Sequence, residues 1–243
     1  MSNKLNNLVI DMGNSSIKVG LFRNNELTKD WVLQNIEEVI AIVKQNEPKR
    51  IIISSVTSGE HSLESLLTAD QIIILDSNTP TPFENHYKTK TTLGVDRVAA
   101  LAGAECINSG KNNLVIDIGS CITYDFLDKT NKYLGGSISP GIDLRFRAMN
   151  DYTKRLPLIT NYNSFELIGK STEEAMISGV VNGILAEMDG IISRYQAKWP
   201  DLEVIICGRA ANSFESNLKA TIFASPKLVL IGLNRILEYN EQS

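Results

Sequence analysis

The order of apolar and polar positions predicts two series of strands, each accompanied by helices. In the first series, apolar or alternating runs predict strands at residues 8–13, 17–23, 26–33, 49–56 and 71–75. Helical spacing over 36–46 predicts a helix that Pro48 ends, and a short helix is expected at 61–67. Antiparallel strands followed by helix and strand alternation predict a mixed sheet with crossover helices.

The same order restarts at residue 112. Strands are expected at 112–119, 121–128, 132–138 and 202–208. A long helix over 171–199 begins at Ser171 as N-cap, with Glu174 three residues on, and a last helix covers 228–240. Between the two series lie a proline-containing loop at 77–94 and an alanine-rich helix at 96–107.

A repeated segment explains the restart. NNLVIDMGNSSI at residues 6–17 and NNLVIDIGSCIT at 112–123 share six leading residues and the glycine two places after the aspartate. A fixed self-similarity of this kind indicates an internal duplication. We therefore expect two subdomains of the same architecture, at residues 1–110 and 111–243.

The paired Asp-x-Gly turns suggest phosphate binding. A glycine after a strand exposes backbone N–H groups, which can hold phosphate oxygens beside small polar side chains. Asp11 is suited to a divalent cation, directly or through water, and Lys18 would add positive charge. The alternative is a pair of ordinary β-hairpins, because Asp-x-Gly is common at strand ends. Its occurrence at the ends of two matching strands favours the binding of a nucleotide through its phosphates.

Composition narrows the function further. A net charge of −4 does not favour nucleic acid or anionic membrane as a partner. Three cysteines without a CxxC pair, Cys106, Cys121 and Cys207, indicate free thiols in a reducing cytosol. His61 and His86 are too isolated for a metal site. We expect a cytoplasmic protein, with no signal peptide and no apolar run long enough to span a membrane.

Five stretches together resemble type III pantothenate kinase, within the superfamily of acetate and sugar kinases, 70-kDa heat-shock chaperones and actin. They are residues 11–22, 87–104, 115–125, 135–157 and 171–183, in the family's order and near its spacing. The resemblance implies an α/β fold: a duplicated ribonuclease H-like (actin-like ATPase) fold of two mixed-sheet domains with a cleft between them. It also implies ATP-dependent phosphorylation of pantothenate to 4′-phosphopantothenate, the first step of coenzyme A biosynthesis.

The motif Gly94-Val95-Asp96-Arg97 would contact the substrate. A carboxylate at a helix start can accept the proton of an attacking hydroxyl, and an arginine suits a carboxylate or phosphate. A helix-dipole acid beside a solvated arginine is the alternative from the residues alone. The resemblance assigns Asp96 as catalytic base and Arg97 to pantothenate. It also places Tyr87 and Thr172 at the substrate, although Lys90 stands where the family commonly has proline.

The resemblance assigns the remaining site residues to ATP and cations. The ATP residues are Asp11, Met12, Gly13, Asn14, Ser15, Ser16, Ile17, Lys18, Ser120 and Gly208. Asp117 would hold a monovalent cation, K⁺ or NH₄⁺, with Asp125 a further candidate, while Mg²⁺ would accompany ATP near Asp11. Cys121 and Arg209 depart from the family pattern. Family members are usually homodimers, so a homodimer is expected.

Two other functions remain open from the sequence. One is another small-molecule kinase of the superfamily, of sugar or acetate type; the other is a non-catalytic ATP-binding regulatory protein. The Cys/His cluster common in repressor-type sugar kinases is absent from the sequence, and the Asp96–Arg97 pair argues for catalysis. The cations of 145–155 suggest a basic patch near ATP or, more simply, a solvated helix face or subunit contact.

Overall fold

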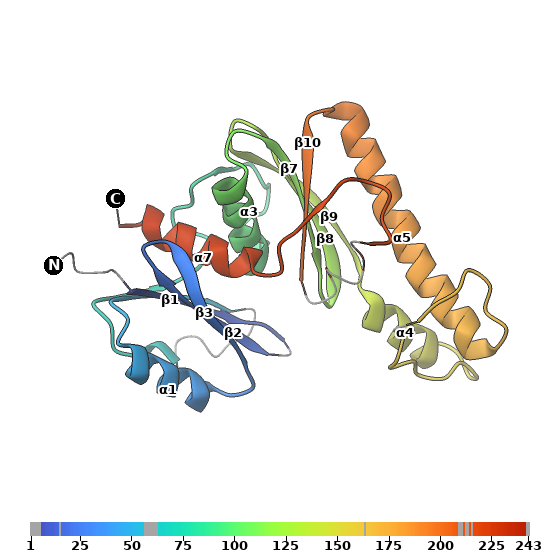
Figure 1. Ribbon diagram of the computed structural model, residues 1–243, viewed down its shortest axis with the longest axis horizontal. Helices are drawn as coiled ribbons and strands as arrows, with labels where there is room; N and C mark the ends of the chain where they lie inside the picture. The colour runs from blue at the N-terminus through green and yellow to red at the C-terminus, as the bar shows by residue number, and fades with distance from the viewer. Residues whose placement is uncertain are drawn as a thin grey trace. The chain divides into compact units, whose positions relative to one another are not determined.

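The computed structural model of the chain describes residues 6–14, 16–55, 63–162, 164–208, 211, 214 and 216–241 (Figure 1). The described chain divides into two compact units. Unit 1 contains residues 1–110, Leu127–Gly135 and Lys227–Ser243, and unit 2 contains Lys111–Phe126 and Gly136–Pro226. Unit 1 thus includes two segments that come after residue 110 in the chain. The last of these contains a helix that packs on the N-terminal sheet.

Unit 1 is built on a five-stranded sheet with the order β3-β2-β1-β4-β5. Its strands are β1 (Asn6–Met12), β2 (Ile17–Arg23), β3 (Glu26–Leu33), β4 (Arg50–Ser55) and β5 (Gln71–Ile74). The first three are antiparallel, and β4 and β5 run parallel to β1. Asn24 and Asn25 adopt positive φ in the β2–β3 turn, which suits a two-residue hairpin. These strands agree with the sequence prediction.

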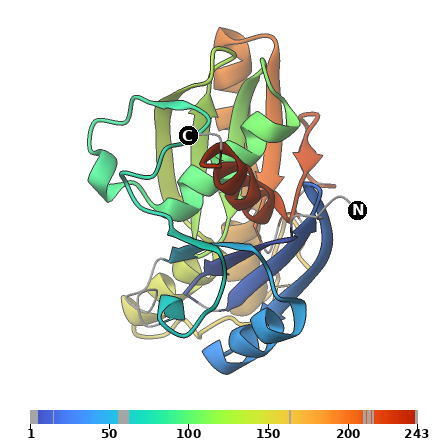
Figure 2. The same cartoon turned by 90° about the vertical axis from the view of Figure 1, so that its left-hand side faces the viewer.

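The two faces of this sheet are covered by different helices. Helix α1 (Ile36–Asn46) packs its apolar face on Leu8, Ile10 and their neighbours, and it ends where Glu47 adopts positive φ before Pro48. Helix α7 (Leu228–Tyr239) contacts β1 and β4 and also packs along α3 (Val95–Ile107), as Figure 2 shows. The predicted helix at 61–67 lies partly outside the described residues, since His61 and Ser62 are not described.

Unit 2 repeats the strand order. The second sheet has the order β11-β10-β7-β8-β9-β6, so β9-β8-β7-β10-β11 matches β3-β2-β1-β4-β5. Its strands are β7 (Asn112–Ile118), β8 (Cys121–Leu127), β9 (Lys132–Pro140), β10 (Leu202–Cys207), β11 (Phe223–Ala224) and β6 (Glu84–Asn85). The predicted fold class, a duplicated α/β fold with two mixed sheets, is confirmed. The sequence reading missed the two-residue strands β6 and β11 and the short 3-10 helix η1 (Lys90–Thr92).

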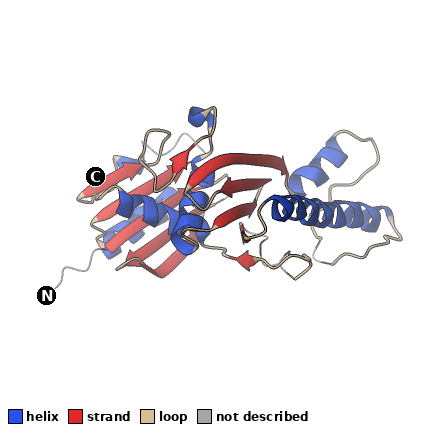
Figure 3. Ribbon diagram, turned by 90° about the horizontal axis from the view of Figure 1, so that it is seen from above, coloured by secondary structure: helices blue, strands red, loops and turns tan. Residues whose placement is uncertain are grey.

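Helix α5 (Thr172–Lys198) is the main cover of the second sheet, together with α4 (Ile142–Asp151) (Figure 3). Ser171 caps α5 by accepting a hydrogen bond from the Glu174 N–H, as predicted. By length and composition α5 also passes as a membrane-spanning candidate, which corrects the expectation that no segment would. Its buried residues, among them Ile184 and Met188, belong to the hydrophobic core of unit 2, which accounts for its apolar composition.

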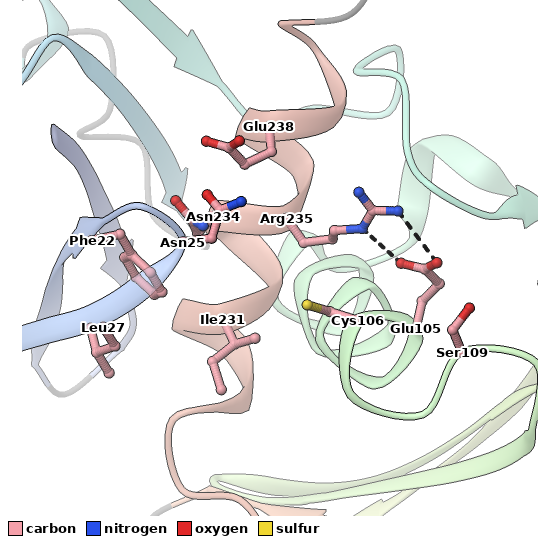
Figure 4. A pocket seen from close by; sticks show the side chains of 10 residues that line it. All are labelled: Phe22, Asn25, Leu27, Glu105, Cys106, Ser109, Ile231, Asn234, Arg235 and Glu238. Carbon is pink, nitrogen blue, oxygen red and sulfur yellow. Dashed lines mark hydrogen bonds and ion pairs between the residues drawn. The ribbon is translucent and has the colours of Figure 1, made fainter. Parts of the chain in front are cut away.

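Glycines set how closely α3 and α7 pack. A Cβ atom on Gly232 of α7 would overlap the carbonyl oxygen of Ala99, and one on Gly103 of α3 would overlap Leu228. The charged pair of Glu105 and Arg235, 2.8 Å apart, ties the same two helices together beside a pocket of about 470 Å³ (Figure 4). The alanine-rich composition of α3 is thus explained by close contact with α7.

We predict that Gly232→Ala destabilises the protein, because the added methyl group meets backbone that cannot move aside. The expected loss in free energy of unfolding is about 1–3 kcal/mol, measured by urea denaturation. Gly190→Ala is the matched control, since Gly190 lies in helix α5 with open space at its Cβ position. That variant should gain about 0.5–1 kcal/mol. Equal stability of the two variants would contradict this account of the packing.

Candidate active site

The first Asp-x-Gly turn joins β1 to β2 at the carboxyl end of β1. Asp11 lies opposite Lys18 in the antiparallel register and beside Ser54 in the parallel register with β4. The Ser54 hydroxyl donates a 2.9 Å hydrogen bond to the Asp11 carboxylate, which is 8% exposed. Three neighbouring strands therefore hold one carboxylate in place at the edge of the sheet.

Burial raises the pKa of Asp11 above its usual value. The Lys18 charge and the hydrogen bond from Ser54 act in the opposite direction, and the negative charge of Asp96 adds to the rise. Asp96, the predicted catalytic base, is thus close enough in unit 1 to act on the pKa of Asp11, the predicted cation ligand. A cation near Asp11 would reverse part of this repulsion.

The rest of the turn has buried and exposed parts. Met12 and Ile17 belong to the hydrophobic core, so only their backbone is available to a ligand. The Gly13 N–H donates to the Ser16 carbonyl at 3.2 Å and closes the turn, with Asn14 exposed at its tip. Ser15 lies outside the described residues. Among the predicted nucleotide-binding side chains of this turn, Asn14, Ser16 and Lys18 are at least partly accessible.

The Gly94–Arg97 motif forms the start of α3. Gly94 is the N-cap, Val95 begins the helix, and the Asp96 carboxylate accepts a 2.9 Å hydrogen bond from the Arg97 N–H. A Cβ atom on Gly94 would overlap this carboxylate, so glycine leaves room for it. Asp96 is half-buried, whereas Arg97 is only 7% exposed. The helix therefore fixes the candidate base at its positive end.

The Arg97 side chain is surrounded by aromatic rings. Its guanidinium lies over the Tyr87 ring, 5.5 Å from the ring centre, and donates a 2.9 Å hydrogen bond to the Tyr133 hydroxyl. The rings of Tyr87 and Tyr133 stack, with centres 5.8 Å apart. Sequence reasoning predicted Tyr87 and Arg97 but missed Tyr133, which only looked like a core position of a strand.

In unit 2, the second Asp-x-Gly turn follows β7. Asp117, half-buried, pairs in register with Cys207 of β10, and Gly208 directly follows that strand. Gly208 has φ of +90°, and a Cβ atom there would overlap the Asp117 carboxylate. Gly208 thus gives the predicted cation ligand the space it needs. Arg209, the departure noted in the sequence, lies outside the described residues.

The turn after Asp117 is open to solvent. Gly119 and Ser120 are exposed, and the Gly119 N–H donates to the Cys121 carbonyl at 2.9 Å. Gly141 follows β9 and packs against this turn, since its N–H donates to the Ser120 carbonyl at 3.1 Å. The structure therefore brings the predicted residues Asp117, Ser120 and Gly208 to the same edge of the second sheet.

Three other predicted positions of unit 2 lie elsewhere. Thr172 is exposed in the first turn of α5, and Asp125 is buried inside β8 at 2% exposure. Arg145 of the suggested basic patch is already paired: it forms a 2.6 Å ion pair with Glu187 and donates to the Pro140 carbonyl. Burial alone would raise the pKa of Glu187, but hydrogen bonds led by that from Arg145 lower it. Arg145 therefore anchors α4 to α5.

The side chains of the candidate site in unit 1 suit a magnesium ion that is also coordinated by water and phosphate better than a metal ion coordinated by protein side chains alone. Within the described ranges, no three His, Cys, Asp or Glu side chains are grouped as such a metal would require. Mg²⁺ usually keeps several waters and takes one or two carboxylates together with substrate phosphates. Asp11 supplies one suitably placed carboxylate.

Comparison with solved structures supports the fold class described above. A structure from Campylobacter jejuni that carries the name of a Baf family transcriptional activator matches with a TM-score of 0.64 at 23% identity, over 97% of this chain and 100% of that one. A ROK hexokinase from Thermus thermophilus matches with a TM-score of 0.52 at 10% identity, over 98% and 100%. The class is the actin-like ATPase fold, which ROK kinases share.

Sequence comparison then gives the family. The family model of type III pantothenate kinase matches residues 7–194, and the chain belongs to this family. Relatives named type III pantothenate kinase include one from Cytophaga hutchinsonii, 41% identical over 96% of this chain and 99% of the relative. Another, from Phocaeicola vulgatus, is 42% identical over 97% and 99%. The family resemblance seen in the sequence is confirmed.

We predict that Asp11→Asn makes the folded protein more stable at pH 7. Because the folded pKa of Asp11 is raised, its contribution to stability is present below the unfolded pKa and is lost as the pH rises through the folded pKa. At pH 7 the buried charge is therefore a cost, and asparagine can still accept the Ser54 hydrogen bond. Asp11→Asn should therefore have a larger free energy of unfolding than the parent at pH 7 and a smaller advantage at pH 4, measured by urea denaturation.

Ser54→Ala is the control for this prediction. It leaves the Asp11 charge in place and removes its hydrogen bond, so stability at pH 7 should fall by about 1 kcal/mol. An Asp11→Asn protein that is less stable than the parent at pH 7 would show that the buried Asp11 charge does not destabilise the folded protein.

Proposed function

We propose that this chain transfers the γ-phosphate of ATP to pantothenate and forms 4′-phosphopantothenate, the first step of coenzyme A biosynthesis. The observation that carries the proposal is the start of α3, where Asp96 and Arg97 lie next to each other with Tyr87 against the guanidinium. Membership of the type III pantothenate kinase family supports it. Three of the residues that the family resemblance assigns to the substrate, Tyr87, Asp96 and Arg97, belong to unit 1, whereas Thr172 belongs to unit 2.

In this proposal Asp96 is the general base. Its carboxylate accepts the proton of the pantothenate hydroxyl as the hydroxyl oxygen forms a bond to the γ-phosphorus. The bond from the γ-phosphorus to the oxygen that bridges the β- and γ-phosphates breaks, and ADP is the leaving group. The hydrogen bond from the Arg97 N–H holds the carboxylate in one orientation. Arg97 itself offers a forked set of donors to the substrate's carboxylate or to phosphate. Most of the rate enhancement comes from positioning and electrostatic stabilisation.

The two glycine turns would bind ATP. In unit 1 the contacts come from the Asp11–Lys18 turn, and in unit 2 from Ser120 and Gly208. Asp11 would hold Mg²⁺, directly or through water, and a bound magnesium ion offsets negative charge on the phosphates. Asp117 would hold K⁺ or NH₄⁺. The proposal also includes Thr172 as a pantothenate contact, a homodimer as the active form, and the cytoplasm as its location.

We predict that Asp96→Asn lowers the turnover number at least about 100-fold, because asparagine cannot accept the hydroxyl proton. Thermal unfolding should stay close to that of the parent, since the amide oxygen can still accept the Arg97 N–H. Phosphorylation is measured by coupling ADP release to NADH oxidation. Glu37→Gln is the matched control: it alters another acid in a first helical turn of unit 1, where the residue is exposed. Near-parental turnover of Asp96→Asn would place the base elsewhere.

The same assay separates pantothenate from other acceptors. Parent protein is tested with pantothenate, with a panel of sugars, and with acetate, each with and without potassium. Activity on a sugar or on acetate, and none on pantothenate, would support the alternative kinases. ATP binding without transfer to any acceptor would support a non-catalytic regulatory protein.

We predict that Asp117→Asn reduces the activation of the enzyme by potassium, because a neutral amide holds a cation less strongly than a carboxylate does. The rate is measured as a function of potassium concentration, and the half-activating concentration should rise about tenfold, the equivalent of roughly 1.4 kcal/mol. Glu203→Gln, an exposed acid on β10 of the same sheet, should leave the potassium response unchanged. An unaltered response in Asp117→Asn would contradict the assignment.

A further inference from the structure

Tyr133 is a fully buried residue that contacts two residues of the proposed substrate region, Arg97 and Tyr87, and the neighbouring ring of Phe83. Its hydroxyl accepts a hydrogen bond from Arg97, its ring stacks on Tyr87, and its ring edge packs against Phe83, with centres 6.4 Å apart. Its own exposure is 0%. A residue so enclosed cannot itself be displaced easily by a ligand, but it can determine where its neighbours lie.

The backbone at Tyr133 is fixed as firmly as the side chain. Strand β9 pairs with the short strand β6 in a parallel register that places Asn85 opposite Tyr133. The His86 N–H donates to the Tyr133 carbonyl at 3.0 Å, and the Glu84 N–H donates to the Asn131 carbonyl at 2.8 Å. The segment that leads to Tyr87 is thus attached to the strand that carries Tyr133.

The segment that carries Tyr133 belongs to the same unit as Arg97 and Tyr87. Residues Leu127–Gly135 belong to unit 1, although the segments on both sides of them belong to unit 2. This segment, which we call the 127–135 arm, contains the turn at Asp128–Asn131 and the first residues of β9. Gly135 ends the arm with φ of +112°, and a Cβ atom there would lie 3.8 Å from the Tyr87 ring. The arm therefore adds one buried aromatic residue to the substrate region of unit 1.

The arrangement restricts the Arg97 guanidinium. A long arginine side chain loses rotamer entropy when it binds a ligand. This loss is smaller if the side chain is already held in one orientation in the free protein. The Tyr133 hydroxyl accepts one guanidinium N–H, and the Tyr87 ring covers one face of the group. These two contacts hold the guanidinium in one orientation.

We infer that Tyr133 is a positioning residue for pantothenate: its hydroxyl and ring hold Arg97 and Tyr87 in the orientation in which they bind the substrate. The inference rests on the proposed function, because it takes Arg97 and Tyr87 as substrate-binding residues. Tyr133 does not touch the reacting atoms. Its effect is exerted on substrate affinity and should not reach the chemical step carried out by Asp96.

The test is Tyr133→Phe, which removes the hydroxyl and keeps the stacked ring. Initial rates with pantothenate and ATP varied separately should show KM for pantothenate raised about tenfold, as expected for a lost hydrogen bond to a charged group. The turnover number and KM for ATP should stay within about twofold. An equal rise in KM for both substrates, an unchanged KM for pantothenate, or failure of this variant to fold would each overturn the inference.

Tyr124→Phe is the matched control. Tyr124 is also 0% exposed, and its hydroxyl also bonds to a charged side chain, donating to Glu187 at 2.8 Å in unit 2. The two variants carry the same chemical change at equally buried positions. If the loss of a buried hydroxyl acted only by loosening the fold, Tyr124→Phe would raise KM for pantothenate as much as Tyr133→Phe does. We expect Tyr124→Phe to lower the unfolding temperature without that selective effect.

A double-mutant cycle shows whether Tyr133 acts through Arg97. In an Arg97→Ala background, Tyr133→Phe should change the affinity for pantothenate less than twofold, because the group that it positions is gone. A full tenfold effect in that background would overturn the inference. Failure of the proposed function is distinguishable: it would appear as no phosphorylation of pantothenate by the parent protein, before any variant is compared.

Discussion

The parallel pairing of each central strand with its neighbour is the constraint on which the candidate site depends. In unit 1, β1 pairs with β4, so that Asp11 and Ser54 reach the same edge of the sheet in register. In unit 2, β7 pairs with β10, so that Asp117 lies beside the strand end at Cys207. Because each acid is the penultimate residue of a central strand, the backbone hydrogen bonds of its sheet fix it more firmly than a loop would.

The environment of Asp11 illustrates the conflict between stability and function at such a position. A carboxylate that is 8% exposed loses most of its hydration, and this loss outweighs the favourable effects of Lys18 and Ser54 on its pKa. A protein under selection for stability alone would favour an apolar or neutral residue there. A charged residue at this cost is reasonable if a cation compensates for it during the reaction, which agrees with the proposed role of Asp11.

Much of the fold could be predicted from the sequence because its signals are local. Apolar runs and the Ser171 cap predict the longer strands of both sheets and, to within a residue or two, the bounds of α1 and α5. The repeated NNLVID segment predicts the duplication. The sequence could not show that α7 returns to the first sheet, because that placement depends on packing between Gly232 and Ala99, which are far apart in the chain. The strands β6 and β11 were missed because two residues carry no periodic pattern.

The site shows the same division between local and non-local signals. Asp11, Asp96 and Asp117 stand in short motifs, so their residue types and spacing predict them as candidate site residues. Tyr133 has no motif, and alternation in β9 assigns its ring to a core. Its hydrogen bond to Arg97 joins residues 36 positions apart, and the 127–135 arm that carries it also pairs with the two residues of β6. A strand too short to be detected in the sequence therefore attaches the segment that leads to Tyr87 to the strand that carries Tyr133.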